Sequence, residues 1–144
     1  MHGLLKNAEA RWVKAAVAAA SNTDSNSAII DTQGYESVLF IVPVTSSVAT
    51  GIAKIQIEEN DANQDAGMAA VNNAVAQAVS AGANDIASKV LVVEYVKPRK
   101  RYVQAVITSQ TANIAFGEMV AILVPFARPA QQGATVLASG LGQG

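Results

Sequence analysis

The clearest hydrophobic pattern in the chain is an apolar run over residues 38–44 that follows a polar turn at residues 31–34. Six of the seven residues in the run are apolar, and β-branched residues are frequent among them. A short apolar run bounded by turn residues predicts a strand that is buried on both faces. The seventh residue, Pro43, lacks a backbone N–H, so we expect it near the strand end or where its N side is unpaired.

Residues 52–58 show a different pattern, in which apolar and polar side chains alternate from Ala53 onward. Such alternation is typical of an antiparallel strand with one buried and one exposed face. Two groups therefore separate onto opposite faces, Ala53, Ile55 and Ile57 on one and Lys54, Gln56 and Glu58 on the other.

Three further strands are expected over residues 89–96, 101–109 and 114–126, separated by polar turns. Gly117 interrupts the last of them, where we expect a bulge or bend. Short strands at regular spacing predict an all-β fold. We expect a single antiparallel β-sandwich, jelly-roll-like, with extended N- and C-terminal arms.

Two segments fit either a helix or a strand. Residues 68–80 are rich in alanine, but their valines suit both periodicities. Residues 4–20 are rich in helix formers, yet from about Arg11 onward the extended interpretation is slightly favoured, with residues 12–20 and 28–30 as a loose hairpin. The resulting domain division is an N-terminal arm at residues 1–10, a sandwich at 11–130 and a C-terminal arm at 131–144.

Composition changes this picture in one respect, the nature of the surface. The 144 residues suit one domain, of which 51% are hydrophobic, 5% aromatic and only 15% charged. Soluble domains carry about 25% charged residues, so part of this surface is expected to be covered by partners. The net charge of −1 gives no broad case for nucleic-acid binding, and no run is long enough for a membrane span. No export signal is predicted.

The acidic loop after residue 58 offers one candidate metal site. Asp61, Asn63 and Asp65 have the alternate spacing of calcium ligands. However, Gly67 comes one position late for an EF-hand, and Asn72 stands where a bidentate glutamate is needed. The pattern therefore favours a solvated hairpin tip, and no metal site or other cofactor is predicted.

A basic cluster formed by Lys97, Arg99, Lys100 and Arg101 lies between Tyr95 and Tyr102. In a chain of net negative charge it favours a charged turn, either for solubility or for a salt-bridged contact with an acidic neighbour, over a phosphate-binding patch.

Catalytic chemistry finds little support in the sequence. The single histidine, His2, falls in the N-terminal arm, and there is no cysteine. The usual nucleophile–base pairs therefore cannot be assembled, and no glycine-rich phosphate loop follows a strand. We expect a protein that is not an enzyme, with no catalytic residue and no cofactor-binding residue.

The turn-and-strand motif at residues 31–37, DTQGYES, resembles the D-T-K-G-Y-D-S signature of a family of small tailed-bacteriophage virion proteins. Residues 54–61, 95–103 and 121–130 are similar, in order, to its acidic hairpin, its Y-x-G-x-K-R-Y-V-R element and its closing strand. The resemblance covers roughly residues 28–130. The chain departs from the pattern in its alanine-rich residues 68–80, its Pro98 turn and its C-terminal arm.

The resemblance implies a β-sandwich structural protein of the virion, assembled in the host cytoplasm. The expected role is a capsid decoration (cement) protein, a homotrimer that binds the major capsid protein on the outer shell. No nucleic acid, membrane or small-molecule partner is expected. The alternatives are a head–tail connector or tail-associated subunit and, in a different class, a carbohydrate-binding or hydrolytic β-domain of phage origin. The terminal arms either fray or order on a neighbouring subunit, and their apolar composition favours the second.

Overall fold

The computed structural model describes residues 3–142 and 144, and nearly all of its regular structure is β-strand. One short helix and eleven strands follow in chain order: α1 (Leu4–Asn7), β1 (Glu9–Lys14), β2 (Val17–Ala20), β3 (Thr23–Asn26), β4 (Ile30–Asp31), β5 (Tyr35–Ser47), β6 (Ile52–Asn60), β7 (Ala69–Val79), β8 (Lys89–Val96), β9 (Tyr102–Gln110), β10 (Ile114–Phe116) and β11 (Met119–Pro125). No helix in the described part of the chain has the length and apolar character needed to cross a bilayer.

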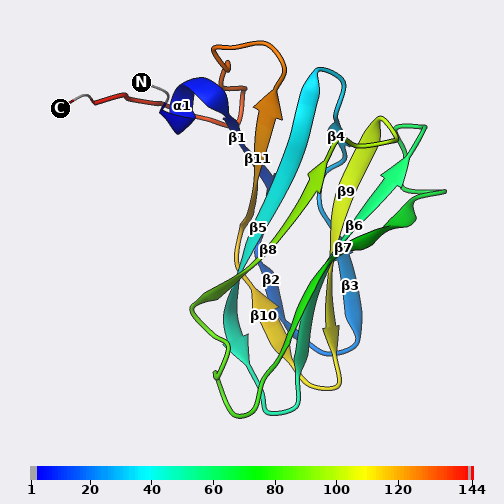
Figure 1. Cartoon of the computed structure of the whole chain (residues 1–144). Helices are drawn as coiled ribbons and strands as arrows, with labels where there is room; N and C mark the ends of the chain where they lie inside the picture. Colours follow the sequence, from blue (N-terminus) through cyan, green and yellow to red (C-terminus); the bar gives the residue numbers. More distant parts are fainter. Residues whose placement is uncertain (1–2, 143) are drawn as a thin grey trace.

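The strands form two antiparallel sheets that pack face to face (Figure 1). In the first sheet, β5 pairs with β8 on one side and with β11 and β10 in succession on the other, and these two pair in turn with β1 and β2. In the second sheet, β9 lies between β6 and the short strands β3 and β4, and β7 forms the far edge. Each sheet is therefore four strands wide.

The strand order is that of a jelly roll. When β1/β2, β3/β4 and β10/β11 are each counted as one interrupted strand, eight strands remain. Their chain order across the first sheet is 1-8-3-6 and across the second 2-7-4-5, as in a double-sheet jelly roll. The expected antiparallel β-sandwich is confirmed.

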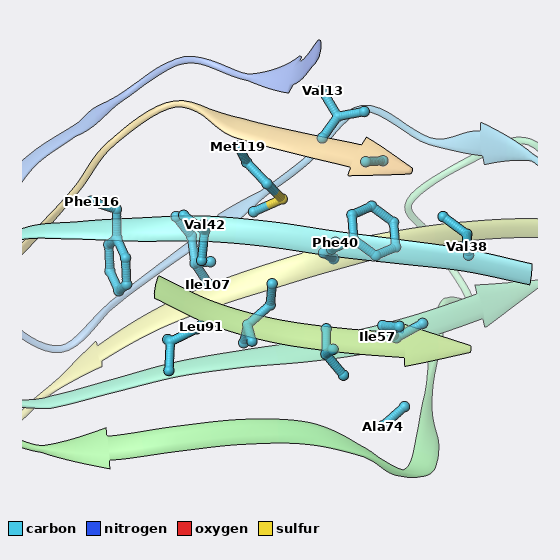
Figure 2. Close-up of a cluster of buried hydrophobic side chains, with 14 of the residues drawn as sticks. Val13, Val38, Phe40, Val42, Ile57, Ala74, Leu91, Ile107, Phe116 and Met119 are labelled. Atoms are coloured by element: carbon cyan, nitrogen blue, oxygen red, sulfur yellow. The ribbon is translucent and has the colours of Figure 1, made fainter. Parts of the chain in front are cut away.

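The core lies between the sheets and is filled by the inward-facing side chains of both (Figure 2). Phe40 and Met119 of the first sheet face Ile57 and Ile107 of the second, and all four are almost fully buried. The alternation predicted for residues 52–58 is confirmed, since every second residue of β6 is buried.

The prediction that β5 is buried on both faces is wrong. Val38, Phe40 and Val42 point into the core, but Leu39 and Ile41 lie on the outer face of the first sheet and are only half-buried. No second layer of the described chain covers that face, so alternate apolar residues in this strand remain partly open to solvent.

The two ambiguous segments are mostly strand. Only residues 4–7 are helical, and residues 69–79 form β7. The expected hairpin between residues 12–20 and 28–30 is wrong, because β1 and β2 belong to the first sheet and β3 and β4 to the second. The polar stretch before β3 therefore carries the chain from one sheet to the other, as a jelly roll requires.

Candidate functional site

The 31–34 turn is held by the side chain of Asp31. Its Oδ1 accepts a hydrogen bond from the backbone N–H of Gln33 at 3.0 Å and so caps the turn. Arg101 donates from Nε and Nη2 to the two carboxylate oxygens, each at 2.8 Å. This hydrogen-bonded guanidinium lowers the pKa of Asp31. The turn is thereby fixed to the loop that joins β8 to β9.

Tyr35 fastens the start of β5 to β1. Its hydroxyl donates to Oε1 of the buried Glu9 at 2.7 Å, and the guanidinium of Arg11 lies 5.8 Å from the ring centroid. Burial, together with the bond to Glu9, raises the pKa of the Tyr35 hydroxyl. The Tyr35 side chain therefore serves to position strands.

The basic cluster is largely neutralised within the chain. Arg99 pairs with Glu59 at 3.4 Å, Lys100 with Asp61 at 3.5 Å, and Arg101 with Asp31. These ion pairs tie the β8–β9 loop to the end of β6, to the β6–β7 loop and to the 31–34 turn. The geometry thus matches the interpretation of a charged turn in salt-bridged contact with acidic neighbours.

The acidic loop forms the hairpin between β6 and β7, and its side chains point toward different partners. Asp61 pairs with Lys100, whereas Asp65 accepts hydrogen bonds from Asn26 and Gln104 at 2.9 and 2.7 Å. Within residues 3–142 and 144, no group of three acidic or histidine side chains is arranged to hold a metal ion. His2, the remaining candidate side chain, lies outside the described residues.

The C-terminal segment begins by covering the free edge of β1. The Gln132 side chain accepts a hydrogen bond from the backbone N–H of Ala10 and donates one to the carbonyl oxygen of Ala8, both at 2.9 Å. The hydroxyl of Thr135 accepts from the N–H of Trp12 at 3.2 Å. These side chains satisfy backbone groups that an edge strand would otherwise leave unpaired.

Beyond Thr135 the segment leaves the sandwich and runs beside α1 (Figure 1). The side chain of Leu137 is fully exposed, and Leu4 of α1 is 81% exposed. Residues 137–142 and α1 therefore project from the same corner of the domain. The arm predicted at residues 131–144 consists of a fastened base followed by a free apolar end.

An apolar groove of about 530 Å³ lies next to this corner. Its floor is the outer face of the first sheet, with Leu39, Ile41 and Ile122, and its wall is the start of the chain, with Leu5 and Ala8. Gln132, which fastens the C-terminal segment, also borders the groove. Groove and arm are thus neighbours on one side of the molecule.

The groove is part of a larger surface that we call the apolar face, the outer face of the first sheet. One row across it runs through Trp12, Val120, Ile41 and Val92 on four neighbouring strands. Its outward-facing apolar residues, all exposed or half-buried, are Ala10, Trp12, Leu39, Ile41, Pro43, Val90, Val92, Val96, Val120, Ile122 and Val124.

Sequence reasoning missed the apolar face, although the signal was present. Residues 38–44, 90–93 and 119–124 are apolar throughout, without the polar residue at every second position that a solvent-exposed strand face normally carries. That pattern was interpreted as burial between layers of one chain, whereas the structure leaves one of the two faces without cover. A scan against protein-family models finds no match for the chain, and a search of curated proteins finds none either.

Proposed function

We propose that the protein is a structural component of a tailed-phage particle, a capsid decoration protein that binds the outer shell and stabilises it. The observation that carries the proposal is the jelly-roll domain whose terminal segments project, with exposed Leu4 and Leu137, from a single corner. The resemblance of residues 31–37 to a virion-protein signature supports the same conclusion.

The residues of that signature maintain the fold in this proposal. Asp31 and Tyr35 are engaged with Arg101 and Glu9 inside the domain, so they fix loops and strands without facing a ligand. Attachment is then the task of the projecting segments, which can reach a neighbour because their outer ends make few contacts with the sandwich.

The proposed partners are the major capsid protein and further copies of this chain in a homotrimer. Each arm offers only a few apolar side chains, so a single contact is weak. Three arms on one trimer act together, because binding of the first raises the effective concentration of the others. The expected result is tight attachment built from modest contacts.

The test is binding of the purified protein to expanded capsids that lack it, measured by co-sedimentation and by cryo-electron microscopy. A decoration protein is expected on all equivalent positions of the shell, whereas a head–tail connector occupies one vertex and a tail subunit is absent from the head. A variant ending at Val136 should bind at least about tenfold more weakly, since each trimer then loses three contacts.

Two outcomes would contradict this role. Full-length protein that fails to bind expanded capsids at any concentration would remove the decoration function. Binding at a single vertex would replace it with the connector function. As a matched control for the arm, Ala138→Gly alters an exposed residue in the same segment without removing a large apolar side chain, and should bind as the wild type does.

A further inference from the structure

The two sheets present opposite chemistry to their surroundings. The middle of the second sheet is mostly polar on its outer side, with Lys54, Gln56 and Glu58 on β6 and Thr108 on β9. The apolar face of the first sheet carries valine, leucine, isoleucine and tryptophan at the corresponding positions. In an antiparallel sandwich, a face that meets water is expected to be polar, so the first sheet departs from that pattern.

The apolar face is as large as the largest apolar patch of a typical soluble monomer. Four strands about 4.8 Å apart, over the eight residues of β8 at about 3.4 Å each, cover on the order of 500 Å². The largest apolar patch on a typical soluble monomer is about 300–600 Å² and is often functional. The side chains are also well exposed, with Trp12 at 47% and Val90 at 58%.

Charge is confined to the rim of this surface. Glu94 faces outward between Val92 and Val96 on β8, the edge strand of the sheet. Glu118, just before β11, accepts a hydrogen bond from the indole N–H of Trp12 at 2.6 Å. Covering the central strands β5 and β11 would therefore bury no charged group from those strands, whose outward residues include Leu39, Ile41, Val120 and Ile122. A partner that covers the centre needs a matching apolar surface.

We propose that the apolar face is the surface through which copies of this chain associate with one another. A second copy carries an apolar surface of the same extent, and two such faces together bury about 1,000 Å², the lower limit for a specific protein interface. The surface is continuous with the groove beside Gln132, from which the C-terminal arm departs, so an associated copy also lies within reach of the arm.

This inference deepens the proposed function by naming the surface at which its subunits meet, and it rests on that function only for the expected number of three. Two faces in full contact close a dimer, whereas in a trimer each copy shares its face between two neighbours. Self-association removes the apolar face from water and leaves the polar second sheet exposed.

The test compares two aspartate substitutions on opposite sheets. Val92→Asp places a charge on the apolar face, and Val75→Asp places one on the outer side of the second sheet. The two valines are matched in residue type, in strand setting and in exposure, at 44% and 42%. Sedimentation velocity over a wide concentration range gives the mass of the particle, and far-ultraviolet circular dichroism checks that each variant is folded.

Wild type and Val75→Asp should form the same oligomer. Val92→Asp should raise the dissociation constant at least about tenfold, because an unpaired carboxylate would be buried in the contact. Val92→Thr keeps the side-chain shape and adds only a hydroxyl; it serves if the aspartate variant does not fold, and should weaken association in the same direction.

A wild-type protein that is monomeric at every concentration overturns the inference, as does a Val92→Asp variant that associates like the wild type. Capsid binding separates these failures from failure of the proposed function. If Val92→Asp remains oligomeric but no longer binds capsids, the apolar face contacts the shell, which overturns the inference and supports the function. If Val92→Asp is monomeric and the wild type associates without binding capsids, the inference holds and the function fails.

Discussion

The backbone N–H of Gly117 donates a hydrogen bond to the carbonyl oxygen of Pro43 at 2.8 Å, and the ring of Pro43 occupies the space that a side chain at Gly117 would need. A Cβ at Gly117 would lie 2.7 Å from Cγ of Pro43. At this point β5 changes its partner from β11 to β10. The N side of Pro43, which has no N–H, thus faces the interruption between those two strands.

We predict that Gly117→Ala destabilises the protein by about 1–3 kcal/mol, because the added methyl group overlaps the proline ring and the chain must shift to admit it. Urea unfolding followed by tryptophan fluorescence measures the free energy of unfolding. Gly82→Ala is the matched control, since a Cβ there meets nothing within 4 Å, and its effect should stay within about 0.5 kcal/mol. Equal stability of both variants would contradict the steric argument.

A second prediction concerns the buried carboxylate of Glu59. The hydroxyl of Tyr95 donates to its Oε2 at 2.6 Å, and both side chains are buried at one end of the sandwich. Tyr95→Phe removes this donor and should cost about 1.5–3 kcal/mol, the range for hydrogen bonds to charged groups. Thermal unfolding at neutral pH measures the loss.

The control for that substitution is Tyr102→Phe. Within residues 3–142 and 144 the hydroxyl of Tyr102 makes no side-chain hydrogen bond, unlike that of Tyr95, and the guanidinium of Arg101 lies 5.2 Å from the centroid of its ring. Its removal should change stability by less than about 0.5 kcal/mol. Equal losses of stability in the two variants would show that the hydrogen bond from Tyr95 to Glu59 does not stabilise the fold.

The third prediction is a pH dependence that arises at Asp31. The pKa of Asp31 is lower in the folded state than in the unfolded chain. The ionised carboxylate therefore stabilises the fold fully at pH values above the unfolded-state pKa of about 3.9, and this stabilisation is lost as the pH falls through the folded-state pKa. Asp31→Asn should therefore be less stable than the wild type at pH 7, and the difference should shrink toward pH 3. Because the ion pair is about half exposed, we expect a difference of no more than about 1 kcal/mol.

Asparagine can still cap the turn at Gln33, so this substitution isolates the charge on residue 31. The measurement is the free energy of unfolding as a function of pH for the wild type, Asp31→Asn and Glu94→Gln. Glu94 is exposed on an edge strand and serves as the control carboxylate. A pH profile of Asp31→Asn parallel to that of the wild type would exclude the proposed contribution.

The fourth prediction separates the two parts of the C-terminal arm. Removal of residues 137–144 should leave the free energy of unfolding unchanged, because Leu137 makes little contact with the sandwich. Removal of residues 131–144 also takes away Gln132 and Thr135, which bond the edge of β1, and should cost about 1–3 kcal/mol while the sandwich remains folded. Unfolding by urea compares the two. Identical stability of both truncated chains would show that the edge contacts are dispensable.

The strands that could be predicted from the sequence are those in which every second side chain is buried. Residues 52–58 alternate because one side of β6 faces the core and the other faces solvent, and Gly117 marked a real interruption. The ambiguity of residues 68–80 has a physical reason. β7 is an edge strand with a register shift between Gln56 and Glu58 of its partner, so its valines do not keep one face.

Long-range features could not be derived in the same way. The pairing of β1 with β11 joins residues more than a hundred positions apart, and nothing local distinguishes it from the expected hairpin. The contacts of Tyr35 with Glu9 and of Gln132 with Ala10 depend on the same pairing. An apolar run likewise does not reveal whether both of its sides are buried in the core or only one is, which is why the outer side of β5 was misassigned.

The pairing of β1 with β11 has a consequence for biosynthesis. β1 finds its partner only when residues 119–125 have emerged from the ribosome, so the first sheet stays incomplete while the residues between the two strands are made. Until then β5 lacks its neighbour on that side, and its apolar side chains remain accessible to other nascent chains. Such non-local strand pairing is slow and prone to aggregation, so the yield of soluble protein should depend on chaperones that protect the incomplete sheet.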